Sequence, residues 1–394
     1  PPFQAEDGIR DIHCSLVGSE MCIRDSIITM DPAQPIVSGV ALRGEQIVAV
    51  GERDAVMGLV ADSTRVVDLG EQALLPGFID SHGHFSATAR LIDYVNLSSP
   101  PVGTANNIDD VVDLLAAHIA ERQVPKGEWV MGYGYDDSLL AENRHPTRDD
   151  LDKASTDHPI ALMHVSGHFA AVNSAALADK DVGDETPDPP GGIIRRRPDS
   201  QVPNGVLEET AARLVLGRLD GGSAERFETL ARRATRYYAG FGITTVQDGG
   251  ATPSNIAALR AAAAKLPFAL DIAAYPFATR LGVEGHSDFT QDSSYEDGIR
   301  VAGVKFSLDG SPQGRTAWLT EPYTERPEGA APDYVAKPTM EPAYYKDRDA
   351  DLNARGVPVL VHANCDAAID LMIDGVPEAV ADGPLPDHRS VIIH

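Results

Sequence analysis

The stretch LLPGFIDSHGH at residues 74–84 decides the fold of this chain. It predicts a buried strand that ends in two histidines. Alternate side chains of a strand share a face, so His82 and His84 point the same way and can hold one cation between their imidazole nitrogens. His-x-His alone is a common pattern, and an ordinary surface or core histidine pair is the alternative unless further ligands are found.

The flanks of this pair resemble a known family. A Pro-Gly turn into an apolar strand, then an acidic residue and His-x-His, resembles the first barrel strand of the amidohydrolase superfamily, in which both histidines are metal ligands. Further stretches look like amidohydrolase family 3, the branch that includes N-substituted formamide deformylases, and the resemblance covers nearly everything from Ile27 to His394. The stretches are His164 to His168, Asn173 to Leu177, Asn204 to Glu209, Asp309 to Ser311 with Gly314 to Thr316, and His362 to Ala368.

Composition narrows the class of partner. The formal net charge is −26 and the sequence pI is about 4.7. Both argue against nucleic acid and an anionic membrane surface, which attract basic patches. No apolar run approaches the roughly 18 residues of a membrane span. We expect a cytoplasmic protein with a small-molecule substrate, and we leave a homodimer open.

The first 26 residues are unlike the rest. They resemble translated sequencing-adapter read-through, so residues 1–26 are expected to be an artefact and are set aside in assigning the fold. Cys14 and Cys22 fall inside this segment. Cys365 is then the remaining cysteine, and no disulfide framework is expected.

The remaining sequence predicts an α/β protein built on a TIM-type (β/α)8 barrel, with about six of the eight strands present. Short β-branched runs bounded by turn residues predict a partial β-sandwich accessory domain over 27–73. The barrel domain covers 74–394, with an insertion at about 100–222 after the first barrel strand. The later barrel strands are expected at residues 243–248, 268–275, 301–308, 357–362 and 390–394.

The resemblance implies three further ligands. In this superfamily the bridging ligand comes from strand four and single histidines come from strands five and six. Those strands carry Lys305, His362 and His394. Lys305 would be carboxylated and would bridge two metals, and a mononuclear site is the alternative. We expect one or two divalent ions, with zinc as the metal that neutral imidazole suits.

A catalytic aspartate on strand eight is also implied by the resemblance. The sequence stops before that strand, and none of Asp80, Asp248 or Asp309 is assigned in its place. Lys305 and His394 are therefore the catalytic candidates within this sequence. We expect little or no turnover by the chain as written.

Substrate contacts are predicted at three further residues. His164 and His168 lie at and just past a strand end, and Arg315 lies in a Gly-flanked loop. A structural histidine pair and an exposed salt bridge are the respective alternatives. Cys365 is either a small core residue or a perturbing thiol beside His362.

These residues predict a metal-dependent hydrolase of amide-type C–N bonds, such as N-substituted formamides, that acts through a metal-activated water. An ester or lactone hydrolase on the same site, or a non-catalytic metal-binding barrel, stays open.

Overall fold

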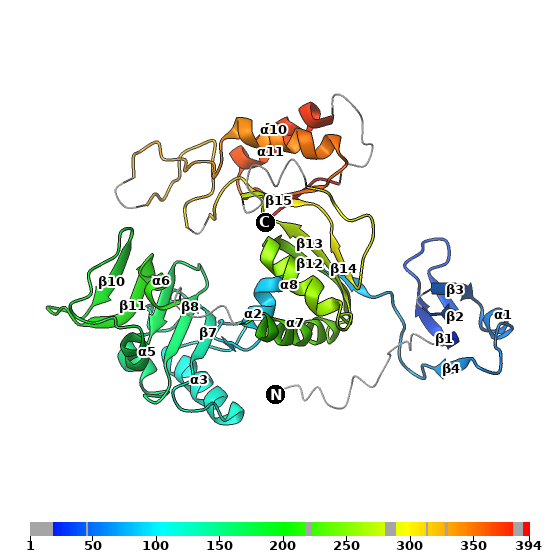
Figure 1. Cartoon of the computed structure of the whole chain (residues 1–394), viewed down its shortest axis with the longest axis horizontal. Helices are drawn as coiled ribbons and strands as arrows, with labels where there is room; N and C mark the ends of the chain where they lie inside the picture. The colour runs from blue at the N-terminus through cyan, green and yellow to red at the C-terminus, as the bar shows by residue number, and fades with distance from the viewer. Residues whose placement is uncertain are drawn as a thin grey trace. The chain divides into compact units, whose positions relative to one another are not determined.

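A computed structural model describes residues 19–44, 46–216, 223–279, 289–312, 314–327, 330–380 and 389–394 (Figure 1). The chain divides into two compact units. The first comprises Pro1–Asp80 and Tyr237–Thr245, and the second comprises Ser81–Arg236 and Val246–His394. Within the described ranges, no helix combines the length and apolarity needed to cross a membrane.

The first unit holds a four-stranded sheet with the order β3-β2-β1-β4. Its strands are β1 (Ser19–Ile28), β2 (Ile36–Arg43), β3 (Gln46–Gly51) and β4 (Arg65–Asp68), and the short helix α1 (Arg53–Met57) packs against β2. Strand β1 pairs antiparallel with β2 and parallel with β4. Residues 19–26, which the sequence analysis set aside, thus form most of β1, and their adapter-like origin stays a prediction.

The stretch at 74–84 forms a much shorter strand than expected. Strand β5 (Phe78–Ile79) has two residues and pairs parallel with the start of β12 (Ile243–Ala251). The prediction that this strand is buried was wrong, because Phe78 is 54% and Ile79 is 72% exposed. Strand β5 is the edge strand of its sheet, so it pairs on one side only.

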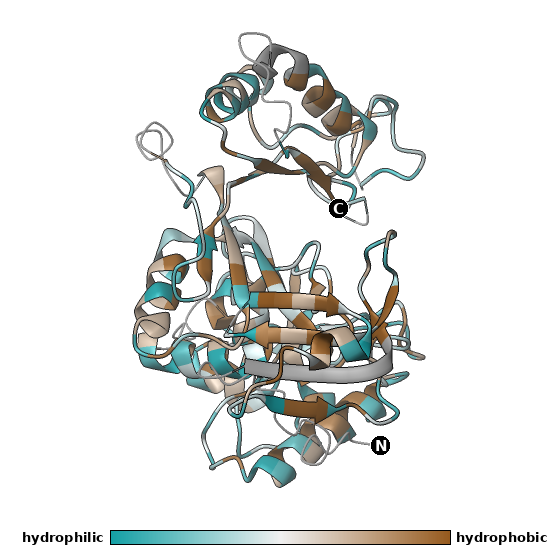
Figure 2. Cartoon of the chain, turned by 90° about the vertical axis from the view of Figure 1, so that its right-hand side faces the viewer, coloured by the Kyte–Doolittle hydropathy of each residue, from teal (hydrophilic) through white to brown (hydrophobic). Residues whose placement is uncertain are grey.

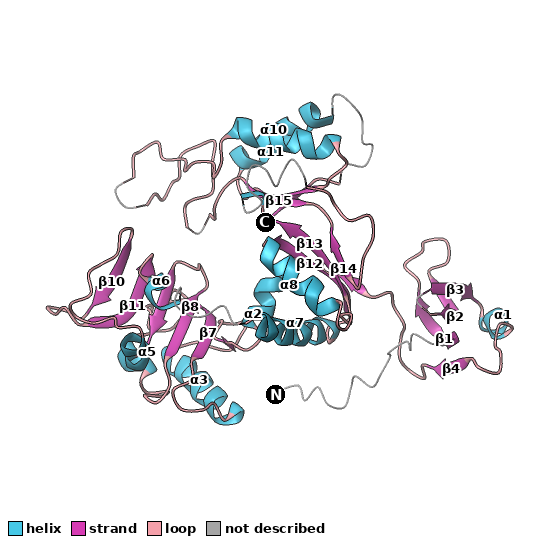
Figure 3. Cartoon of the chain, in the orientation of Figure 1, coloured by secondary structure: helices cyan, strands magenta, loops and turns pink. Residues whose placement is uncertain are grey.

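Strands between residues 95 and 209 form a six-stranded mixed sheet with the order β10-β11-β9-β8-β7-β6, and the status of this region as an insertion stays a prediction. The strands that begin it, β6 (Val95–Asn96), β7 (Val130–Tyr135) and β8 (Ile160–His164), run parallel to one another. Strands β9 (Phe169–Val172), β10 (Gly192–Arg196) and β11 (Pro203–Glu209) complete it as antiparallel neighbours. Its helices are α3 (Ile108–Arg122), α4 (Arg148–Leu151), α5 (Ser174–Asp179) and α6 (Ala212–Val215) (Figure 3). Helix α2 (Phe85–Leu91) precedes the sheet in sequence and is joined to β12 by the hydrogen bonds between Ser86 and Asp248.

Strands alternate with helices in the rest of the chain. Helix α7 (Ala224–Ala239) precedes β12, and α8 (Pro253–Ala263) precedes β13 (Asp271–Pro276) and β14 (Ile299–Val301). The last strands are β15 (Val304–Ser307), β16 (Val359–His362) and β17 (Val391–Ile393), with α10 (Pro342–Ala354) and α11 (Asp366–Val380) between them. Strands β13 and β14 pair in parallel, as do β15, β16 and β17 in that order.

The described residues therefore form an α/β structure of separate mixed and parallel sheets, with no closed barrel among them. An isolated parallel bridge between Phe277 and Lys305 links the end of β13 to β15. The strand expected over 301–308 is split, because β14 ends at Val301 and β15 begins at Val304. β14 pairs with β13, whereas β15 pairs with β16, so the chain changes partners between them.

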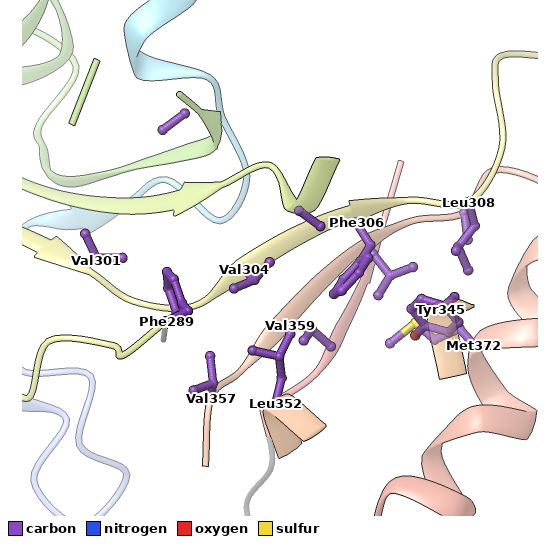
Figure 4. Close-up of a cluster of buried hydrophobic side chains, with 14 of the residues drawn as sticks. Phe289, Val301, Val304, Phe306, Leu308, Tyr345, Leu352, Val357, Val359 and Met372 are labelled. Atoms are coloured by element: carbon purple, nitrogen blue, oxygen red, sulfur yellow. The ribbon is translucent and has the colours of Figure 1, made fainter. Parts of the chain in front are cut away.

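A large apolar cluster supports β15 and its neighbours (Figure 4). Val304 and Phe306 are fully buried, and the Phe306 ring lies 5.3 Å from the ring of Tyr345 on α10. The strands that lead to the C-terminal label are brown in Figure 2. Strand β16, which has a neighbour on each side, is buried, as a central parallel strand should be, whereas Val391 and Ile392 of the edge strand β17 are exposed. Lys305 lies between these two apolar residues, so the alternation of a strand turns its side chain to the opposite face.

Gly303 marks the change of partner between β14 and β15. A Cβ atom at this position would lie 2.2 Å from the carbonyl oxygen of Pro358 and 2.8 Å from Cε1 of Tyr275. We expect Gly303→Ala to lower the free energy of unfolding by about 1–3 kcal/mol, because the backbone of Pro358 has to move. Urea-induced unfolding measures this.

Gly183→Ala is the control, because a Cβ there meets no atom within 4 Å. It should change the unfolding free energy by less than about 0.5 kcal/mol. Equal midpoints for the two variants would contradict the close approach at Gly303.

Candidate metal centre

The structure gathers the five predicted ligands in the second unit. His82 and His84 follow β5, Lys305 lies in β15, His362 ends β16, and His394 follows β17. The Nε2 atoms of His82 and His394 are 3.2 Å apart, and Nζ of Lys305 lies 3.4 Å from Nε2 of His394. The rings of His362 and His394 have centroids 4.4 Å apart. Residues more than 300 positions apart in the sequence thus share one site.

Gln247 on β12 orients the first of these imidazoles. Its Oε1 lies 2.6 Å from Nδ1 of His82. An amide oxygen accepts only, so Nδ1 carries the proton and donates, which leaves the Nε2 lone pair directed at His394. Such hydrogen bonds to the far nitrogen set the tautomer and the ring orientation of metal-binding histidines. Sequence analysis missed Gln247, although its place near the end of a predicted strand was a usable signal.

Two glycines after Gln247 make room for the imidazoles. A Cβ at Gly249 would lie 2.8 Å from Cε1 of His82, and one at Gly250 would lie 3.2 Å from Nδ1 of His84. The glycine pair thus forms a cradle that any larger residue would fill. The backbone N–H of Gly249 also donates to the carbonyl oxygen of Gly83, which ties the His-x-His segment to β12.

The surroundings of the cluster lower the pKa values of three of its groups, His84, His394 and Lys305. Burial first, and then the neighbouring His82, Lys305 and His362, lower the pKa of His84 to about 4. Partial burial, followed by Lys305 and the other histidines, lowers the pKa of His394 to about 4. Burial alone lowers the pKa of Lys305 to about 8, and its side chain is 1% exposed. Neutral imidazoles are the form that binds a metal.

The donor set fits a divalent ion. Each of His82, His84 and His394 offers one nitrogen, and these three atoms all lie within 4.8 Å of one another. Three imidazole donors with a further position open are a known zinc arrangement. His362 lies next to this group but is engaged elsewhere, because its Nε2 lies 3.1 Å from the carbonyl oxygen of Gly310 and 3.0 Å from Nδ2 of Asn364.

Two buried aspartates near the cluster have structural partners. Asp248 accepts hydrogen bonds from the hydroxyl and backbone N–H of Ser86. Asp309 accepts from the backbone N–H groups of Asn364, Cys365 and Trp318. Asp309 thus holds the loop after His362 in place, a role that its sequence position did not reveal. The Cys365 thiol is partly buried, and burial raises its pKa.

The three predicted substrate residues have partners of their own. Nε2 of His164 lies 3.0 Å from Oδ1 of Asp137, and Nδ1 of His168 lies 3.0 Å from Oε1 of Glu209. Nη2 of Arg315 lies 3.0 Å from Oε2 of Glu325 in an exposed ion pair. A role of these residues in substrate binding stays a prediction.

A family model described as the amidohydrolase family matches residues 65–394, which is most of the chain. The chain belongs to the amidohydrolase family. Among curated proteins, an N-substituted formamide deformylase from Arthrobacter pascens is 35% identical over 257 residues, covering 64% of this chain and 46% of that protein. The putative amidohydrolase YtcJ of Bacillus subtilis is 27% identical, covering 79% of this chain and 57% of that protein. These findings confirm the branch, family 3, that the sequence predicted.

Solved structures share the fold. An uncharacterized metal-dependent hydrolase from Pyrococcus horikoshii superposes with a TM-score of 0.67 at 21% identity, covering 92% of this chain and 68% of that one. A second one, from Pyrococcus furiosus, gives a TM-score of 0.65 and covers 92% of this chain and 70% of that one at 21% identity. The chain spans about half of each curated relative reported above.

Replacing Gln247 tests the orientation of His82. We expect Gln247→Met to weaken Zn²⁺ binding to the chelator-treated chain by about 10- to 100-fold, because the imidazole loses the partner that sets its tautomer. Gln247→Glu keeps an acceptor oxygen and should bind Zn²⁺ at least as well as the native chain. Competition with a chromogenic zinc chelator measures both affinities. Equal affinity of the Met and Glu variants would contradict this role.

The depressed histidine pKa values predict a pH dependence of stability in the metal-free chain. Between pH 6.5 and about 4 the unfolded state binds protons that folded His84 and His394 do not. The free energy of unfolding should therefore fall as the pH drops through this window. Above the window these two histidines should make no pH-dependent contribution to it. Urea midpoints at several pH values measure the slope.

The matched variant is His84→Gln with His394→Gln. It should show a shallower slope over the same pH range, since two groups with depressed pKa values are gone. An unchanged slope would show that these histidines do not carry the effect.

Proposed function

We propose that this protein hydrolyses an amide-type C–N bond, in an N-substituted formamide or a related amide, with the help of one or two divalent ions, zinc first among them. The observation that carries the proposal is the grouping of His82, His84 and His394 around the buried Lys305. The choice of substrate rests on the 35% identity to an N-substituted formamide deformylase.

A bound divalent ion would lower the pKa of a water molecule and would polarise the carbonyl group of the substrate. His82, His84 and His394 would hold the first ion through neutral nitrogens. Gln247 would keep Nε2 of His82 directed at the ion, and the Gly249–Gly250 cradle would leave room for the rings of His82 and His84. A second ion would need Lys305 and His362 as additional ligands.

Lys305 would act after carboxylation. Its neutral amine attacks CO2 and forms a new N–C bond, and one proton leaves the nitrogen. The lysine side chain thereby becomes an anionic carbamate. A pKa of about 8 makes the neutral amine far more available than that of an ordinary lysine. The negative charge would then lie among the imidazoles of the cluster and would favour cation binding. Without carboxylation, the three histidines would form a mononuclear site.

Two other functions use the same residues. An ester or lactone hydrolase would share the metal centre and differ in the loops that select the substrate. A non-catalytic binding protein would keep the ion but release no product. Metal-dependent product release separates the binding protein from both hydrolases, and the preferred leaving group separates the hydrolases from each other.

Lys305→Met tests the carbamate. After incubation with ¹³C-bicarbonate and Zn²⁺, we expect the native chain to show a protein-bound carbamate ¹³C signal and about two Zn²⁺ per cluster. The Met variant should lack the signal and lose one Zn²⁺. Lys337→Met, at an exposed lysine, is the control and should behave as the native chain. If the native chain shows no carbamate signal, the carbamate proposal is wrong and the mononuclear site is favoured.

The substrate test uses protein expressed from the locus after resequencing through both ends of the reading frame, because the relatives extend beyond the matched region. N-formyl amines, N-acetyl amines and simple esters are offered with and without Zn²⁺. We expect formate release from the N-formyl amines and its loss in His82→Gln. A preference for esters favours the second hydrolase, and metal binding without any product favours the binding protein.

A further inference from the structure

A second cluster of histidine and carboxylate lies on the six-stranded sheet. Tyr135 and His164 are register partners at the carboxyl ends of the parallel strands β7 and β8, which lie side by side in Figure 1. Asp137 follows Tyr135 by two residues, and His145 lies in the segment that leads to α4. The ligand atoms of Asp137, His145 and His164 all lie within 4.8 Å of one another. None of them belongs to the first cluster.

Both imidazoles of this cluster are deeply buried. The side chain of His145 is 6% exposed and that of His164 is 9% exposed, whereas Asp137 keeps about a third of its side chain in contact with solvent. Phe169 covers both rings, with centroids 4.7 Å from His145 and 5.5 Å from His164. The site is thus open on the side of the carboxylate and closed on the side of the rings.

One atom of the cluster is unsatisfied. Nε2 of His164 has no solvent exposure and no hydrogen-bond partner among the described residues. Oδ1 of Asp137 lies only 3.0 Å away, but the two atoms do not have hydrogen-bond geometry. Leaving a buried ring nitrogen unpaired costs free energy, so this atom indicates a missing partner.

The outer nitrogens of both rings have hydroxyl partners. Nδ1 of His145 lies 3.2 Å from the hydroxyl of Tyr135, and Nδ1 of His164 lies 2.8 Å from the hydroxyl of Ser166. Both hydroxyl oxygens can accept a hydrogen bond from a protonated Nδ1, which would leave the lone pair of each Nε2 free to bind a cation. The backbone N–H of Ser166 also lies 3.1 Å from Nδ1 of His164 and favours the other tautomer in the absence of a cation.

We propose that Asp137, His145 and His164 form a second binding site for a divalent cation of the zinc type, separate from the first cluster. Nε2 of His145 and Nε2 of His164 lie 3.8 Å and 3.0 Å from the carboxylate of Asp137. Ligand atoms of a tetrahedral zinc ion with bonds near 2.1 Å are about 3.4 Å apart, so a cation fits with small movements. Two histidines and one carboxylate leave a coordination position for water or a ligand oxygen.

One cation of the protein lies near this site. The guanidinium of Arg195 stacks over the ring of Phe169 with a distance of 5.7 Å to the centroid. It also donates through Nε to Glu208, and that ion pair offsets its charge. The repulsion that Arg195 would exert on a bound cation is therefore reduced by its own carboxylate partner.

The test counts Zn²⁺ on the tag-free 394-residue chain after chelator treatment, with the first cluster removed by His82→Gln and His84→Gln. After Zn²⁺ is added back and the unbound excess is removed, we expect this variant to hold one Zn²⁺ per chain. Adding Asp137→Asn and His164→Gln should remove it, whereas adding His118→Gln, at a half-buried histidine on α3, should not. Circular dichroism checks that each variant is folded, and elemental analysis after gel filtration counts the metal.

Three outcomes would overturn the second site. In the first, the variant without the first cluster binds no Zn²⁺. In the second, Zn²⁺ still binds after Asp137 and His164 are changed. In the third, the His118 variant loses as much Zn²⁺ as the variant with changes at Asp137 and His164. If the fourfold variant does not fold, Co²⁺ replaces Zn²⁺ on the first variant. Intense visible bands of low-coordinate Co²⁺ would support the site, and the weak spectrum of aquated Co²⁺ would overturn it.

Discussion

Burial of the Lys305 amine is the constraint on which the metal centre depends. An ammonium ion away from water is costly, so the buried side chain is driven towards its neutral form. The same strand places Val304 and Phe306 in the main apolar cluster, which holds β15 against α10. The core therefore fixes the position of the amine, and the neighbouring imidazoles of His84 and His394, with pKa values lowered to about 4, add no charge at neutral pH that would repel a metal ion.

The supporting residues come from elements far away in the sequence. Gln247 and the two glycines of β12 orient and accommodate His82 and His84, which lie some 160 residues earlier. Asp309, after β15, accepts three backbone N–H groups and fixes the loops beside His362. The second cluster has the same organisation, since Tyr135 and Ser166 contact the outer nitrogens of its histidines. In both clusters, at least one histidine is thus oriented by a hydrogen bond on its Nδ1 atom.

Sequence patterns predicted the α/β class and the strands that carry His362 and His394. These features are local, because a strand has a period of two and a buried parallel strand is continuously apolar. The burial of β5 and the single strand over 301–308 were predicted wrongly. Both depend on which strand pairs with which: β5 has one neighbour, and Gly303 allows the chain to leave β13 and join β16.

By itself, the sequence determined which residue types are available for metal chemistry, and on which strands they lie, because side-chain identity and strand period are properties of short segments. It also determined the family, through several short stretches spread along the chain. Only the tertiary structure decided the tautomer of His82, the depressed pKa values of His84, His394 and Lys305, and the pairing of Asp137 with His145 and His164. Each of these arises from atoms that are close in space and distant in the chain, or from loss of contact with water, and neither is encoded in any local pattern.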